Sequence, residues 1–92
     1  MVSLRVSKNG RVLCTAGAED LGVLMAIVQV LGDTNTESRL NSGTSMNLQV
    51  SGGRSHPERE VQHVEWIRRL DLSIGDRVEI EIVDAPDPGS PE

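Results

Sequence analysis

The sequence predicts a small, mostly β domain, built as an antiparallel β-sandwich or a partly open barrel of about six strands. The 92 residues include one Trp but no Phe or Tyr, so Val, Ile, Leu, Met and Ala must form the core. Val and Ile suit a pleated sheet because their branched side chains are stiff at χ1. Several short segments alternate apolar and polar residues, and Gly- or Asn-containing turns separate them. The expected strands are 2–7, 11–14, 23–31, 46–51, 61–72 and 77–83.

The first two strands form the clearest local pattern. Val2, Leu4 and Val6 alternate with polar residues. Asn9-Gly10 follows, and this pair favours a type I′ turn because both central residues of that turn need positive φ. The segment 11–14 then returns as the second strand of a hairpin.

Segments 23–31 and 61–72 each allow two interpretations. The first is apolar on both faces apart from Gln29, which fits a buried strand or a helix near 19–31 that stops at Gly32. Its β-branched content favours a strand. The second has apolar even positions, but its residues Val61, Val64, Ile67 and Leu70 also recur at steps of three. We favour extended chain there and keep an α+β fold with helices near 19–31 and 57–70 as the alternative.

The chain is expected to form one domain over residues 1–83. The stretch 84–92 contains three prolines and is expected to be a disordered tail. Two polar segments, 32–45 and 52–59, are expected to be loops. A domain this small has a thin core, which makes self-association a reasonable expectation.

Composition disfavours several functions. The net charge is −5, and there is one aromatic residue, so a basic face and stacking platforms for nucleic acid are lacking. Such an acidic chain suits a basic protein partner better. One cysteine cannot form an intramolecular disulfide, and no signal-peptide or membrane-length apolar segment is visible. We expect a cytoplasmic protein that binds neither nucleic acid nor membrane.

No chemical motif predicts catalysis, a metal or a cofactor. Cys14 would need His56 or His63 as its base, and the spacing does not bring them together. The two histidines are seven residues apart, unlike the close ligand pairs of zinc sites. The glycines lack the Lys-Ser/Thr that completes a phosphate-binding loop. We therefore expect a protein that is not an enzyme and has no cofactor.

A cluster of arginines around the single Trp is the candidate interface. Trp and Arg are enriched at the energetic centres of protein interfaces. The competing interpretation, which we favour for the Trp, places its side chain in the core. The candidate interface residues are Arg54, Arg59, Trp66, Arg68 and Arg69.

Three stretches resemble a group of small, stand-alone bacterial β proteins of unassigned function. They are the N-terminal strand with its Asn-Gly turn, the stretch His63-Val64-Glu65-Trp66, and the ending from Leu70 through Gly75-Asp76 to Val83. The resemblance implies a bacterial source and an extended conformation for 61–72. It transfers no functional residue.

The function expected from these observations is a non-enzymatic protein-interaction module, such as an inhibitor, an immunity-type protein or an adaptor. It would bind a protein partner, or a second copy as a homodimer, through a sheet edge and polar loops. The alternative is a small-ligand-binding domain that uses loops 32–45 and 52–59 at one end of the sandwich. A third hypothesis is an enzyme with Cys14 as nucleophile and His63 as base.

Overall fold

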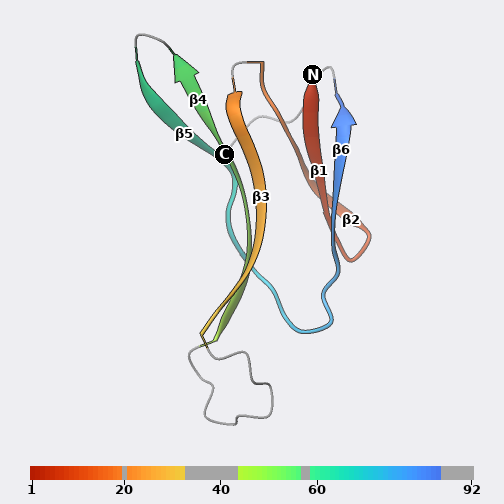
Figure 1. The fold of residues 1–92 in the computed structure, drawn as a ribbon. Helices are drawn as coiled ribbons and strands as arrows, with labels where there is room; N and C mark the ends of the chain where they lie inside the picture. Colours follow the sequence, from red (N-terminus) through yellow and green to blue (C-terminus); the bar gives the residue numbers. More distant parts are fainter. Residues whose placement is uncertain (20, 33–43, 57–58, 86–92) are drawn as a thin grey trace.

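Six antiparallel strands in two three-stranded sheets make up the fold (Figure 1). The structure is a computed structural model that describes residues 1–19, 21–32, 44–56 and 59–85. The predicted β-sandwich or open barrel is confirmed. No helix occurs in the described ranges, so the α+β alternative with helices near 19–31 and 57–70 is wrong. The strands are β1 (Val2–Lys8), β2 (Arg11–Ala16), β3 (Leu21–Leu31), β4 (Ser45–His56), β5 (Arg59–Asp71) and β6 (Val78–Asp84).

The first sheet has the order β2-β1-β6. Its hairpin turns at Asn9 and Gly10, which have φ of 52° and 81°, as a type I′ turn requires. The C-terminal strand β6 returns to pair with β1 along its whole length, from Val2 opposite Asp84 to Lys8 opposite Val78. Asp84 therefore belongs to the domain rather than to the expected tail, of which residues 86–92 lie outside the described ranges.

The second sheet is a meander with the order β3-β4-β5. β4 continues through Gly52 and Gly53 to His56, and β5 begins at Arg59. The expected loop 52–59 is therefore mostly strand, and only Pro57 and Glu58 fall outside the description. The glycine pair does not end the strand. Glycine is needed at position 52 because β3 and Trp66 approach the β4 backbone closely there and leave no room for a side chain.

Register shifts in the β4–β5 pair explain why the pattern of β5 is ambiguous in the sequence. Positions 48, 50 and 52 of β4 face Leu70, Ile67 and Val64 of β5, so β4 advances by two residues while β5 advances by three. Each extra residue is a β-bulge, which bends the strand and increases its twist. The three-residue step of these apolar side chains, which resembles a helical face, is thus produced by bulges. All three pack against the core.

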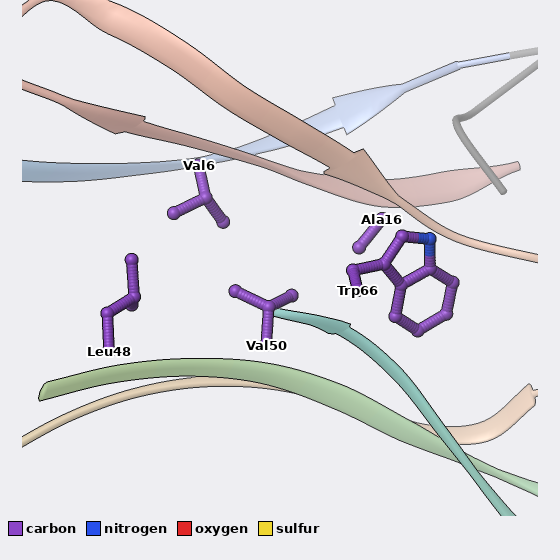
Figure 2. Close-up of a cluster of buried hydrophobic side chains, with 5 residues drawn as sticks. All are labelled: Val6, Ala16, Leu48, Val50 and Trp66. Carbon is purple, nitrogen blue, oxygen red and sulfur yellow. The ribbon is translucent and has the colours of Figure 1, made fainter. Parts of the chain in front are cut away.

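The core lies between the two sheets and is small. Its buried apolar residues among those described are Val6, Ala16, Leu48, Val50 and Trp66. Figure 2 shows side chains from the first sheet facing those of the second, with the indole of Trp66 beside Ala16. Trp66 is 3% exposed, so its position agrees with the core interpretation favoured from the sequence.

The two sheets differ in length. Strands of the first sheet have 7, 6 and 7 residues, whereas those of the second have 11, 12 and 13. At about 3.3 Å per residue the second sheet is longer by about 15 Å, so the first can cover only part of its inner face. The radius of gyration is 15.4 Å, against about 12 Å for a compact chain of this length. The molecule is therefore elongated, and β3 and β4 of the long sheet extend past the first sheet (Figure 1).

A hydrogen-bonded cluster connects the β1–β2 turn to the segment before β6. The Asp76 carboxylate accepts hydrogen bonds from the Asn9 side-chain amide at 3.0 Å and from the Ser73 backbone N–H at 2.8 Å. Lys8 Nζ lies 3.7 Å from the same carboxylate. The Asn9 side-chain oxygen in turn accepts from the backbone N–H of Arg77 at 2.9 Å. The hydrogen bond from Asn9, then that from Ser73, hold the pKa of Asp76 below its ordinary value of 3.8.

We expect this cluster to make stability depend on pH. Because the pKa of Asp76 is lowered in the folded state, its contribution is present above the ordinary value and is lost as the pH falls through the lowered pKa. Asp76→Asn should therefore lower the free energy of unfolding at neutral pH and flatten its decline between about pH 5 and pH 2. Denaturant unfolding of both proteins at several pH values measures this.

The exposed Glu79 lies outside this cluster, and Glu79→Gln provides the control for loss of one surface carboxylate at neutral pH, where it should leave the free energy of unfolding nearly unchanged. The pKa of Asp84 is also lowered, by a hydrogen bond from the N-terminal ammonium group. Its contribution to the pH dependence is present in both wild type and Asp76→Asn, so the difference between the two curves belongs to Asp76. If the free energy of unfolding changes with pH equally in wild type and Asp76→Asn, the Asp76 cluster does not make stability depend on pH.

Candidate functional site

The outer edge strand β3 exposes the largest set of apolar side chains. Among the described strands it pairs with β4 alone, so no described strand covers its other backbone edge. Its exposed apolar residues are each between 36% and 51% exposed and lie within residues 23–31, here called the β3 edge; they are Val23, Met25, Ile27, Val28, Val30 and Leu31. Both faces contribute, because Val28 is opposite the buried Leu48 on the inner face and Ile27 is opposite Gln49 on the outer face.

The β3 edge lacks the features that normally prevent edge-to-edge association. Natural edge strands carry charged residues or prolines, are short, or are bulged. None of the eleven residues of β3 is charged or proline, and its only register shift is at its start, between Leu21 and Val23. The other edge strands have such features: β5 carries four charged residues within 65–71, β6 carries Glu79 and Glu81, and β2 is only six residues long.

The margin of the first sheet next to this side is also apolar. Ile80 and Ile82 of β6 lie opposite Val6 and Leu4 of β1, so their side chains belong to the core-facing side of the sheet. They nevertheless are 44% and 78% exposed, respectively. The second sheet thus leaves this margin uncovered, and the sandwich is open along β6.

A trough separates β2 and β5 on the other margin of the sandwich. Two adjoining hollows, of about 400 Å³ and 290 Å³, share Leu13 and Leu70 as apolar lining. Basic side chains from both strands and the turn line them, namely Lys8, Arg11, Arg68 and Arg69. Sequence reasoning found the last two of these but not the first two, since only the folded arrangement brings the β1–β2 turn beside β5.

The basic side chains of the trough are partly neutralised. Arg68 Nε lies 3.4 Å from a carboxylate oxygen of Glu65, and Arg69 Nε lies 3.3 Å from one of Asp71. Arg69 also donates a hydrogen bond to Ser45 Oγ at 3.1 Å, which orients its guanidinium group. The side chains of both arginines are well exposed, so these ion pairs contribute little to stability.

The remaining candidate interface residues, Arg54, Arg59 and Trp66, come from different parts of β4 and β5. Arg54 is half-buried on the central strand β4, opposite Gln62 of β5. Arg59 is the first residue of β5, at the far end of the β4–β5 hairpin. Trp66 borders the trough but is buried in the core, so it supports the surface from inside.

Cys14 and His63 lie on different sides of the second sheet. Cys14 is opposite Val6 and packs against the core between the sheets. His63 is opposite Gly53 on the outer face, with Nε2 at 3.1 Å from a Glu65 carboxylate oxygen. A sheet therefore stands between the thiol and the imidazole, and this arrangement does not support the nucleophile and base hypothesis.

The two expected loops lie at opposite ends of β4. The connection of 32–45 joins β3 to the start of β4, whereas 57–58 follows its last residue, His56. A twelve-residue strand spans about 40 Å, so the two connections leave β4 far apart. Residues 33–43 lie outside the described ranges, and the ligand-binding alternative stays a prediction.

Within the described part of the chain, no group of three or more His, Cys, Asp or Glu side chains is placed to hold a metal ion. The same residues form no helix long and apolar enough to cross a membrane. Comparisons with protein-family models, curated proteins and solved structures find no match to this chain. The resemblance to bacterial β proteins therefore stays a prediction, and function must be argued from these surfaces.

Proposed function

We propose that the protein is a non-enzymatic protein-interaction module of the inhibitor, immunity-type or adaptor kind. The observation that carries this proposal is the β3 edge, an open strand that is apolar on both faces and has no charged residue. An open edge offers unpaired backbone N–H and C=O groups, and a partner strand completes their hydrogen bonds. The exposed apolar side chains beside it add burial on association.

The trough between β2 and β5 supports a second contact. Its apolar floor of Leu13 and Leu70 with a basic rim suits a partner segment that has apolar and acidic side chains. Arg68 and Arg69 are exposed cations on its rim, and arginine contacts frequently dominate interface energies. The cytoplasmic location and bacterial source expected from the sequence belong to the same proposal.

Capture from lysate of the native cell tests the proposal. The tagged protein should retain one protein in stoichiometric amount, and Arg68→Ala with Arg69→Ala should weaken its binding about tenfold. Arg77→Ala removes an exposed cation that does not line the trough, and it serves as the control. Quantitative mass spectrometry of the retained proteins, followed by titration of the purified partner, gives both results.

Retention of no protein other than the chain itself, together with a monomeric state in solution, would contradict the proposed function. Equal binding by the double variant and wild type would remove the trough from the interface and leave only the β3 edge.

A further inference from the structure

We infer that the β3 edge binds the β3 edge of a second copy of this chain, in antiparallel pairing about a twofold axis at Ile27. This inference rests on the proposed function and specifies the partner of its main surface. It joins two three-stranded sheets into one continuous six-stranded sheet in which the order of strands is β5-β4-β3-β3-β4-β5.

The charge distribution favours a second copy over an unrelated partner. The chain has a net charge of −5, so most contacts between two copies bring like charges together. The other long edge, β5, and the open edge β6 both carry charged side chains on their exposed faces. The β3 edge has no charged residue, so pairing it with the same edge of a second copy brings no charged side chains together. Of these three edges, β3 is therefore the one along which two copies pair without like charges facing each other.

The register follows from the regular part of β3. A bulge interrupts pairing between Leu21 and Val23, and residues 23–31 then pair with β4 without interruption. The midpoint of that stretch is Ile27. A twofold axis there maps outer face onto outer face, so Val23 lies opposite the copy's Leu31 and Ile27 opposite its counterpart. Directly opposite residues of an antiparallel pair lie on one face about 4.5–5.5 Å apart, so these apolar side chains contact.

Self-pairing also covers apolar side chains that the short first sheet leaves exposed. Val28 and Val30 belong to the inner face of β3, because they pair with Leu48 and Met46 of β4. Both are about half-exposed in one chain. In the proposed dimer, Ala26 and Leu24 of the second copy lie opposite them and bury part of that surface. The pairing thus compensates for the small core described above.

The decisive experiment compares the mass in solution of wild type, Ile27→Lys and Ile74→Lys by light scattering at micromolar concentration. Wild type should have twice the mass of one chain. Ile27→Lys places two ammonium groups opposite each other at the axis and should yield monomer, with the dissociation constant raised at least tenfold. Ile74→Lys changes an exposed isoleucine in the turn before β6, outside the β3 edge, and should stay dimeric. Far-UV circular dichroism checks that both variants are folded.

A charge pair tests the register. Val23→Glu combined with Leu31→Lys puts opposite charges across the axis twice, while the two substituted positions of one chain lie about 26 Å apart. The double variant should dimerise at least as tightly as Leu31→Lys alone. If Ile27→Lys does not fold, Leu31→Lys, at a half-exposed strand end, provides the disruptive variant.

Each contrary outcome has a distinct meaning. Monomeric wild type that retains a different protein through Ile27 overturns the second-copy inference and leaves the proposed function standing. Monomeric wild type that retains no protein overturns both. A dimer that survives Ile27→Lys in folded protein overturns the β3 edge as its interface.

Discussion

Replacing Trp66 with alanine is expected to lower the free energy of unfolding by about 3–5 kcal/mol. Trp66 is the largest of the five buried apolar side chains and lies between the two sheets (Figure 2). Its removal leaves a cavity that the remaining small side chains cannot fill. A domain of this size has a total stability of about 5–15 kcal/mol, so this loss is a large share of it. Denaturant unfolding followed by far-UV circular dichroism measures the change.

The matched control is Ile74→Ala. Ile74 is a large apolar residue that lies exposed in the turn before β6, so its truncation should change stability by less than about 0.5 kcal/mol. Similar effects of the two substitutions would contradict the assignment of Trp66 as the centre of the core.

Gly52→Ala is expected to destabilise the protein by about 1–3 kcal/mol, although alanine is usually the better residue in a regular element. A Cβ atom at Gly52 would lie 2.7 Å from the backbone oxygen of Val23 and 3.5 Å from the Trp66 ring. The first contact is with backbone, so relief requires a shift of β3 rather than of a side chain. Thermal and denaturant unfolding of the variant measures the loss.

Position 62 supplies the comparison for Gly52. Gln62 is exposed in β5 and faces Arg54 across the strand pair, so Gln62→Ala should have little effect. A neutral or stabilising Gly52→Ala would show that β3 can withdraw from β4 at low cost. Because Gly52 pairs with Leu24 beside the β3 edge, such a result would also weaken the case for a rigid edge there.

Local patterns were sufficient to predict much of this fold. Asn9-Gly10 specified a type I′ turn, and the positive φ angles of both residues confirm it. The alternation of 78, 80 and 82 specified β6. The β-branched residues of 23–31 favoured a strand, and β3 covers that segment. In each case the signal comes from neighbouring residues, so one sequence contains it.

Other features depend on contacts between distant segments. The bulges of β5 change its period from two to three, so simple alternation fails there. Gly52 was taken as the end of a strand, but the close approach of Val23 and Trp66 determines its role. The sequence likewise showed Arg68 and Arg69 without revealing that Lys8 and Arg11 lie beside them.

The candidate surface was predicted less completely than the fold. An open sheet edge was expected, but which strand forms it depends on the strand order within each sheet, and short-range periodicity does not contain that order. Once the order is known, the absence of charge in β3 becomes informative. The same apolar run that suggested a fully buried strand in the sequence lies on the edge, where its side chains are exposed on both faces.

Trp66 gives this chain one intrinsic fluorophore, because the sequence contains no Tyr and no second Trp. Its indole is buried at the junction of the two sheets, on the inner face of the second sheet beside Gly52. Its emission therefore reports whether the indole stays buried between the sheets. Dilution that dissociates copies without unfolding them should leave the emission maximum unchanged, whereas unfolding shifts it to the red. The protein thus contains a probe that distinguishes loss of assembly from loss of structure.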